Sequence, residues 1–264
     1  MAKNDKYAIL SFSGGLDSTS LLINLIHSDF KVLCITFDYG QNHLLEIEKS
    51  KKNISYLESC GIDNIVSHKI INIKDAFDNK GSSLFNNDKE IPIGHYEDSN
   101  MLSTFVPNRN AIFTSIIFSY ALSWSKDLGD KKVSISLGCH SGDHAIYPDC
   151  RPEFYKSLLD SLKIGNWGGE LISDYMPYID CSKADILKEA LSMIKHLDLD
   201  YKTIYKNTNT SYSPDKDGVS PGNTGSDIER ILAFDKIGRI DPIKYTEKWV
   251  MLDELLEGRW QEKK

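Results

Sequence analysis

The stretch Ser13-Gly14-Gly15-Leu16-Asp17-Ser18 decides the fold of this chain, because a strand-like run precedes it and a helix-like run follows it. Residues 7–12, YAILSF, have the composition of a buried strand, and residues 18–26, STSLLINLI, carry apolar side chains at helical spacing. The two glycines therefore fall at a strand-to-helix turn. Backbone N–H groups of such a turn bind anions, helped by the positive end of the helix dipole. The sequence predicts a phosphate-binding turn.

Hydroxyl groups and one carboxylate flank the two glycines. Ser13, Ser18 and Thr19 can donate hydrogen bonds to phosphate oxygens. Asp17 needs a cation or polar donors between its carboxylate and a phosphate, which indicates a magnesium ion. A glycine turn that binds nothing stays an alternative for the motif alone. The Gly-Lys-Ser/Thr ending of the mononucleotide P-loop is absent from this stretch.

SGGLDS in this context resembles the PP-loop of the ATP pyrophosphatases, which cleave ATP between the α and β phosphates. The resemblance implies ATP and Mg²⁺ as cofactors, with Asp17 holding the magnesium through the phosphates. We expect ATP contacts from the loop, from its flanks and from the end of the next strand: Ser11, Phe12, Ser13, Gly14, Gly15, Leu16, Asp17, Ser18, Thr19, Ser20, Leu21 and Asp38.

Further strand-like runs at 31–37, 65–73, 132–137 and 175–179 alternate with helix-like runs, which predicts a parallel sheet with right-handed crossovers. We expect an α/β fold of the Rossmann-like PP-loop type, with a five-stranded parallel sheet and helices on both faces. Residues 1–198 are predicted to form this domain. Residues 199–264 are predicted to form a small helical C-terminal appendage, with helices near 227–237 and 243–256. Pro177 places the last strand near a sheet edge.

The composition limits the class of protein. A net charge of −7 over 264 residues argues against a nonspecific nucleic-acid binder, so no direct nucleic-acid binding is expected. No run approaches the roughly 20 apolar residues of a membrane helix, and the first residues lack the apolar region of a signal peptide. Five cysteines without a C-x-x-C pair indicate reduced thiols. We expect a cytoplasmic protein with no membrane contact.

Polar residues follow the second strand run at the rim where open α/β sheets bind ligands. Tyr39 and Gln41 are therefore candidate substrate contacts. Asn108 or Asn110 can cap the helix predicted from residue 111, and Arg109 at its start would face an anion. A surface salt bridge is an equally good interpretation of Arg109. The polar segment 74–104 is expected to be a lid or binding loop.

The densest polar cluster is GCHSGDHAIYPDCRPEF at 138–154, which is unsuited to a core strand and predicts a site loop. Asp143 and Asp149 are suited to accept hydrogen bonds from the N–H edge of a purine-like ring. A zinc site of Cys139, His140, His144 and Cys150 is a weaker alternative, because the spacing matches no closed zinc pattern. His144 could also be an ordinary loop histidine. The side chains expected to line a pocket are Asp143, His144, Tyr147, Asp149 and Arg151.

Ser182 and Lys183 begin another predicted helix, with Ser182 as N-cap and Asp185 in the first turn. Lys183 can reach a phosphate from the sheet rim at this position. A solvated lysine is the alternative for the residue taken alone.

The motifs SGGLDST, FDYGQ, VPNRN, GDHAIYPDCRPEF and SKADI follow one another from residue 13 to residue 186 and together resemble the 7-cyano-7-deazaguanine synthase family, QueC. The resemblance implies adenylation of the carboxylate of 7-carboxy-7-deazaguanine, or a similar small molecule, by ATP. Ammonia then gives an amide, which is dehydrated to a nitrile, with AMP and pyrophosphate as by-products. We assign catalytic roles to Asp17, Lys183 and Arg109. Substrate contacts are assigned to Tyr39, Gln41, Asn110, Asp143, His144, Tyr147, Asp149 and Arg151. A homodimer is expected from the resemblance.

One departure from the family pattern is large. The family carries a four-cysteine zinc site of the form C…CGxCxxCxxR, and alignment on Arg230 places Pro221, Thr224 and Asp227 at the last three cysteine positions. The first position falls near Ser211 or Tyr212, so we expect no zinc.

QueC-like relatives are associated with anti-phage systems, where the resemblance implies that the activated deazaguanine is joined to an amine of a partner protein. The missing cysteines slightly favour this nucleophile over ammonia. A nonenzymatic nucleotide-binding subunit is a further alternative. The intact SGGLDS, Asp149, Arg151 and Lys183 argue against it.

Overall fold

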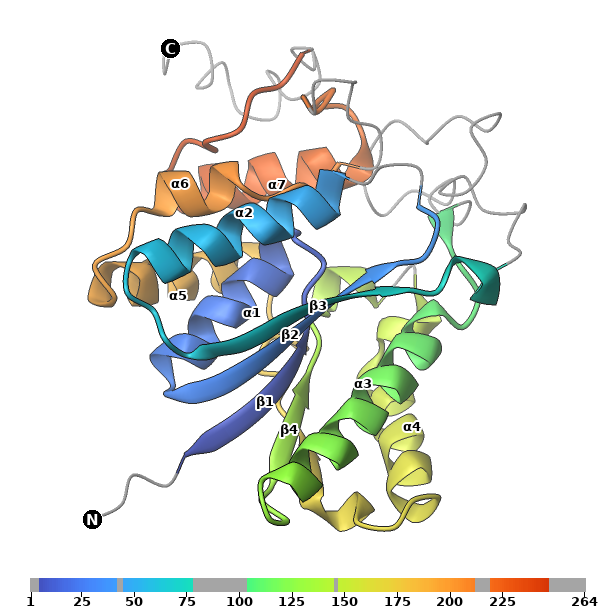
Figure 1. The fold of residues 1–264 in the computed structure, drawn as a ribbon. Helices are drawn as coiled ribbons and strands as arrows, with labels where there is room; N and C mark the ends of the chain where they lie inside the picture. Colours follow the sequence, from blue (N-terminus) through green and yellow to red (C-terminus); the bar gives the residue numbers. More distant parts are fainter. Residues whose placement is uncertain (1–4, 42–44, 78–103, 145–146, 212–218, 247–264) are drawn as a thin grey trace.

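The computed structural model describes residues 5–41, 45–77, 104–144, 147–211 and 219–246. Its centre is a five-stranded sheet with the strand order β3-β2-β1-β4-β5 (Figure 1). The strands are β1 (Lys6–Ser11), β2 (Phe30–Asp38), β3 (Ile65–Asn72), β4 (Val133–Ser136) and β5 (Ile172–Asp174). Every pair of neighbouring strands is parallel. The predicted five-stranded parallel sheet is confirmed.

Helices cover both faces of the sheet, as predicted (Figure 1). On one face lie α1 (Leu16–His27), α2 (Leu45–Ser59), α5 (Lys183–His196), α6 (Tyr201–Lys206) and α7 (Gly225–Lys236). On the other face lie α3 (Arg109–Asp127) and α4 (Pro152–Ile164). Short 3₁₀ turns occur at η1 (Lys74–Ala76), η3 (Ser141–Asp143), η4 (Pro148–Cys150) and η5 (Gly169–Leu171).

The apolar run of β1 is buried on both faces because its successive side chains point to opposite sides of the sheet. Ala8 and Leu10 pack in the core formed with α1 and α5. Tyr7 and Ile9 pack in the core formed with α3 and α4. Because both faces of this central strand are buried, its sequence is a continuous apolar run, as is typical of parallel sheets.

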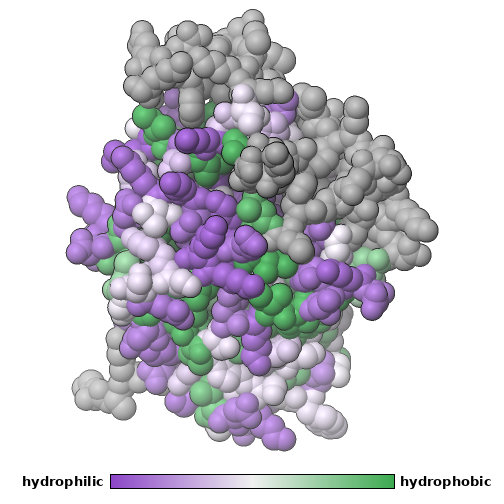
Figure 2. Space-filling model, turned by 45° about the horizontal axis from the view of Figure 1, so that its top comes forward, coloured by the Kyte–Doolittle hydropathy of each residue, from purple (hydrophilic) through white to green (hydrophobic). Residues whose placement is uncertain are grey.

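The strand order places a switch point between β1 and β4. From β1 the chain continues outward through β2 and β3, whereas β4 and β5 extend from the opposite side of β1. Ligands of open α/β sheets bind outside the carboxyl ends of the strands at such a point. The glycine loop after β1 and the polar loop after β4 therefore flank the expected ligand position. Figure 2, turned so that the top of Figure 1 comes forward, shows purple hydrophilic residues with smaller green hydrophobic patches between them on this face.

The fifth strand lies earlier than predicted. It spans Ile172–Asp174, and residues 177–180 form a turn instead of the predicted strand at 175–179. Pro177 has no N–H to donate to a strand ladder. The apolar side chains of this run are nevertheless packed in the core. Tyr178 is fully buried against α1 and α5, and Met176 and Ile179 pack on the opposite face of the sheet.

The C-terminal segment shares the core of the sheet domain. Ile204 of α6 and Phe234 of α7 lie in the same apolar cluster as the side chains of α1 and α5. The sequence did not predict α6, which begins after Asp200, whose carboxylate accepts hydrogen bonds from the backbone N–H groups of Lys202 and Thr203. The domain division at residue 198 stays a prediction.

The predicted helix at 243–256 and the predicted lid at 74–104 lie largely outside the described residues. Residues 243–246 are not helical, and the rest of the helix predicted to 256 lies outside the described part. Residues 78–103 of the predicted lid also lie outside it. Within the described ranges, no helix combines the length and the apolar character that crossing a bilayer requires.

Candidate active site

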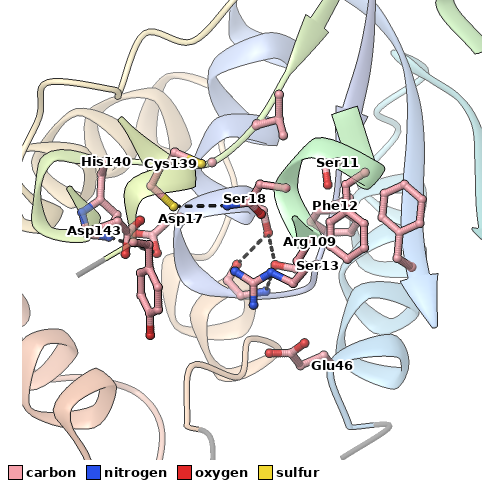
Figure 3. Close-up of a pocket in the computed structure, with 18 of the residues that line it drawn as sticks. Ser11, Phe12, Ser13, Asp17, Ser18, Glu46, Arg109, Cys139, His140 and Asp143 are labelled. Atoms are coloured by element: carbon pink, nitrogen blue, oxygen red, sulfur yellow. Dashed lines mark hydrogen bonds and ion pairs between the residues drawn. The ribbon is translucent and has the colours of Figure 1, made fainter. Parts of the chain in front are cut away.

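A pocket opens at the carboxyl ends of β1, β2 and β4, where the sheet topology places it (Figure 3). Figure 3 shows Asp17, His140 and Asp143 grouped on one side of this pocket, with Arg109, Ser13 and Glu46 on another. The predicted site residues that line it are Ser11, Phe12, Ser13, Gly15, Asp17, Ser18, Tyr39, Arg109, Asn110, Asp143, Tyr147 and Lys183. Residues from both halves of the sheet therefore meet at the glycine loop.

The glycine loop is tightly packed and can contain only glycine at Gly14. Its φ is +84°, and a Cβ there would lie 2.4 Å from the backbone carbonyl oxygen of Glu46. Ser13 Oγ accepts a hydrogen bond from Gly15 N at 3.2 Å and lies 3.0 Å from Ser18 Oγ. On the far side, Asn209 N donates to the carbonyl of Gly14 at 3.1 Å. The C-terminal segment thus supports the loop directly.

Lys183 is a buried ammonium between two carboxylates, not a solvated lysine. Its Nζ lies 2.7 Å from Glu229 Oε2 and 3.4 Å from Asp17 Oδ2, and only 6% of the side chain is exposed. Burial alone would lower the pKa of Lys183, but the carboxylates of Asp17, Glu229 and Asp143 outweigh it and raise the pKa above its ordinary value. Ser182 is the N-cap of α5, as predicted, and it forms a capping box with Asp185 that fixes the start of the helix carrying Lys183.

His140 faces the same carboxylates from the loop after β4. Its Nε2 lies 3.8 Å from Asp17 Oδ2, 3.7 Å from Asp143 Oδ2 and 4.0 Å from Glu229 Oε1. Nδ1 accepts a hydrogen bond from Gly142 N at 3.1 Å, which assigns the proton of the neutral ring to Nε2. The ring therefore presents an N–H to the carboxylate cluster.

The weaker zinc alternative for this loop finds no support in the side-chain contacts. Cys139 Sγ lies 2.9 Å from the hydroxyl of Tyr155, and Cys150 Sγ accepts from Asn110 Nδ2 at 3.2 Å. His140 faces the carboxylates of the pocket. Across the described ranges, His, Cys, Asp and Glu side chains form no group of three or more placed to hold a metal ion.

Asp149 and Arg151 hold the polar loop and the start of α3. Asp149 Oδ2 accepts from Asn110 N at 3.3 Å, and Asn110 Nδ2 donates to the carbonyl of Asp149 at 3.2 Å. Asn108 or Asn110 was predicted to cap this helix, and Asn108 is the N-cap residue of α3, although its side chain makes no cap hydrogen bond. The Asp149 carboxylate meets the helix start instead. Arg151 Nε donates to the carbonyl of His144 at 2.9 Å.

The remaining predicted residues lie in the elements around the pocket. Gln41 accepts from Tyr39 N and donates to the carbonyl of Phe37, which closes the end of β2. Asp38 pairs with Lys74 at 3.0 Å. The predicted ATP contacts on α1 include four residues that are fully buried in the packing of this helix: Leu16, Thr19, Ser20 and Leu21.

Three residues near the pocket were not predicted. Glu46 is partly buried beside Arg109, and burial, opposed by the Arg109 charge, raises the pKa of its carboxyl to about 7. Its position among alternating Glu and Lys residues of α2 gives no sequence signal. Glu229 likewise lies within an ordinary helical run. His140 was named only as a ligand in the alternative zinc site, although it lies in the loop that was predicted to form the site.

Three of the positions where the family pattern has cysteines form one hydrogen-bonded cluster. Asp227 is fully buried, and its Oδ2 accepts from Thr224 Oγ1 at 2.8 Å, from Gly222 N at 3.1 Å and from Ser211 Oγ at 3.2 Å. Burial raises the pKa of Asp227. Thr224 is also the N-cap of α7. Arg230, one turn further along α7, is fully buried and donates to both carboxylate oxygens of Asp241 at 2.7 and 3.0 Å.

The fold and the site together define an α/β protein with a glycine loop at the switch point of a parallel sheet. Residues 7–238 match the family described as queuosine biosynthesis protein QueC, and the chain belongs to this family. It is 37% identical over 238 residues to the 7-cyano-7-deazaguanine synthase of Methanoregula boonei, covering 90% of this chain and 98% of that protein. The corresponding values for the synthase of Marinomonas sp. are 36%, 90% and 97%.

Among solved structures, the NMN synthetase of Francisella tularensis aligns over 96% of this chain and 82% of its own, with 12% identity and a TM-score of 0.39. Similarity at this level is too low to compare function.

Proposed function

We propose that this protein uses ATP to adenylate the carboxylate of 7-carboxy-7-deazaguanine and then transfers the acyl group to an amine. The main support is the arrangement of Lys183 and Asp17 beside the glycine loop, in a chain that belongs to the QueC family. The amine of a partner protein is the favoured nucleophile.

The first step needs neutralisation of negative charge more than it needs a nucleophilic side chain. A substrate carboxylate oxygen attacks the α-phosphorus of ATP, the bond to the β-phosphate oxygen breaks, and pyrophosphate leaves. Negative charge grows on the departing group, and a fixed positive charge in a pocket that excludes water stabilises it. The Lys183 ammonium, held between the carboxylates of Asp17 and Glu229, supplies that charge.

The residues present fit a magnesium ion bound with the phosphates. Asp17 Oδ1 is buried and has no hydrogen-bond partner among the residues described, so a hard oxygen ligand is free on the pocket side of the loop. A magnesium ion held through Asp17 and the phosphates would add positive charge beside the bond that breaks. Lys183 and the hydroxyls of Ser13 and Ser18 would then bind the remaining phosphate oxygens.

The second step transfers the acyl group. The neutral amine attacks the acyl carbon, the bond to AMP breaks, and one proton leaves the amine, giving an amide, AMP and H⁺. The cluster around Asp227 favours a changed role for the C-terminal segment, because a closed set of hydrogen bonds stands where the family pattern has thiolates. We propose that this segment is held without zinc.

Ammonia is the second candidate nucleophile, giving 7-cyano-7-deazaguanine after dehydration of the amide. The names of relatives 36–37% identical over 90% of this chain favour it.

Mass spectrometry of two parallel incubations tests the proposal. Both contain the protein, ATP, Mg²⁺ and 7-carboxy-7-deazaguanine; one adds ammonia, and the other adds the proteins encoded beside this one. Conjugation predicts a protein adduct heavier by the acid less one water, together with AMP. A nitrile in the ammonia tube without an adduct in the other contradicts conjugation and supports nitrile synthesis. Release of AMP in neither tube contradicts both. Lys183→Met is the matched inactive control.

A further inference from the structure

Glu229 brings the C-terminal segment into contact with the ATP site. It lies on α7, two residues after Asp227, and its Oε2 makes the shortest ion-pair contact of Lys183, at 2.7 Å. The contact between Lys183 and Asp17 is longer, at 3.4 Å. Glu229 therefore forms the closer ion pair of Lys183, and the carboxylate of Asp17 acts on the ammonium from a greater distance.

We propose that Glu229 is a positioning residue that fixes the Lys183 ammonium and the His140 ring at the phosphate end of the pocket. This inference rests on the proposed adenylation. Lysine carries its charge on a flexible stem with several rotatable bonds, so its ammonium needs a fixed partner to occupy one place. Glu229 Oε2 supplies that partner, and its Oε1 lies 4.0 Å from His140 Nε2.

The loop after β4 is built to admit the Glu229 side chain. A Cβ at Gly142 would lie 2.5 Å from Glu229 Oε1 and 2.8 Å from the His140 ring. Glycine at this position lets the carboxylate approach the loop, and any larger residue would displace it. Gly142 thus offers a second way to move Glu229 without removing its charge.

Hydrogen bonds and an ion pair hold α7 in place on both sides of Glu229. Before it, the Thr224 cap and the Asp227 cluster hold the first turn. After it, buried Arg230 binds Asp241 and donates to Thr208 Oγ1 at 2.7 Å and Thr210 Oγ1 at 3.0 Å. Because neighbouring Asn209 supports the carbonyl of Gly14, the segment reaches the ATP site at two points. The residues that replace the cysteines therefore act on the position of Lys183 through α7.

Removing the Glu229 charge is expected to lower the rate of adenylation without weakening the binding of ATP. A carboxylate close to the phosphates repels them, so its loss leaves ATP binding equal or tighter. Displacing the ammonium lowers the rate, because misplacement by about 1 Å costs on the order of a hundredfold. A purely structural residue would instead lower thermal stability and weaken ATP binding together.

The test measures two quantities for wild type, Glu229→Gln, Glu229→Ala and Gly142→Ala. They are the affinity for ATP with Mg²⁺ by calorimetry, and kcat and KM in substrate-dependent ATP–pyrophosphate exchange. Glu58→Gln, an exposed change on α2, is the matched control. We expect kcat to fall about a hundredfold in Glu229→Ala and about tenfold in Glu229→Gln, which keeps a hydrogen-bond acceptor, with ATP affinity unchanged or higher. Gly142→Ala should also lower kcat.

Two results would overturn the positioning role: exchange by Glu229→Ala and Glu229→Gln at the rate of Glu58→Gln, or equal losses of ATP affinity, kcat and thermal stability. A wild type that binds ATP but shows no exchange contradicts the proposed adenylation instead. The calorimetric comparison then still decides the inference, because weaker ATP binding in Glu229→Gln contradicts it and equal or tighter binding supports it.

Discussion

The ammonium of Lys183 lies 3.4 Å from a carboxylate oxygen of Asp17, although the two residues belong to the first turns of different helices, α5 and α1. These helices pack side by side through a common apolar core, which includes Leu21 and Leu22 of α1 and Ala184 and Leu187 of α5. Their N-termini consequently meet at the same rim of the sheet. Packing of the two helices therefore creates the charged end of the pocket.

Replacing Lys183 by Met should abolish adenylation. The change leaves the carboxylates of Asp17 and Glu229 without their buried cation, next to a leaving group that gains negative charge. We expect pyrophosphate exchange to fall by about 10²–10³-fold, as on removal of a single group that stabilises a transition state electrostatically. Lys188→Met, an exposed change on the same helix, is the control. Equal exchange rates in the two variants would show that Lys183 does not act on the phosphates.

Gly14→Ala should disrupt the glycine loop, whereas Gly61→Ala should not. Both glycines have positive φ, +84° and +82°, so both substitutions strain the backbone to a similar degree. Only at Gly14 does the new Cβ meet another atom, the carbonyl oxygen of Glu46 at 2.4 Å; at Gly61 nothing lies within 4 Å. Calorimetry should show loss of ATP binding in Gly14→Ala alone. Similar ATP affinities in both variants would exclude the packing explanation.

Breaking the buried pair of Arg230 and Asp241 should destabilise the protein strongly. Both side chains are fully buried, so removing one charge leaves the other without compensation. We expect Arg230→Met to lower the free energy of unfolding by about 3–5 kcal/mol. Chemical denaturation measures it, with Lys236→Met, exposed on the same helix, as control. A loss below about 1 kcal/mol would mean that the C-terminal segment is held by other contacts.

Glu46 should make stability depend on pH. Burial raises the pKa of its carboxyl to about 7 from an ordinary value of 4.5. Between these values the folded protein holds a proton that the unfolded chain has lost, so stability falls as the pH rises. Glu46→Gln should therefore be more stable than wild type by about 3 kcal/mol at pH 8, with no difference below pH 4.5. Denaturation curves at both pH values, with exposed Glu48→Gln as reference, check this. A difference that is the same at both pH values contradicts the shift.

Local patterns predicted those parts of the fold that depend on contiguous residues. The apolar run before Ser13 and the helical spacing after it correctly predicted β1 and α1. The strand predicted at YMPYI is wrong because an apolar composition indicates only that side chains are buried, not that they belong to a strand. Tyr178 is buried although it lies in a turn.

In the candidate site, too, the sequence predicted residues in short motifs and missed those that helix packing brings together. Asp17 and Lys183 were found because they lie in short motifs. Glu229 and Glu46 were not, because their proximity to Lys183 and Arg109 depends on how helices far apart in the sequence pack. The substrate role assigned to Asp149 stays a prediction, and the hydrogen bond from Asn110 N to its carboxylate was not predicted.

Exchange of labelled pyrophosphate into ATP tests the central claim most directly. The measurement uses the full chain with ATP and Mg²⁺, with and without 7-carboxy-7-deazaguanine, and needs no knowledge of the final nucleophile. The adenylation account predicts label in ATP only when the carboxylate substrate is present, and none with Lys183→Met. Exchange that does not depend on the substrate, or no exchange in wild type that binds ATP, would contradict it.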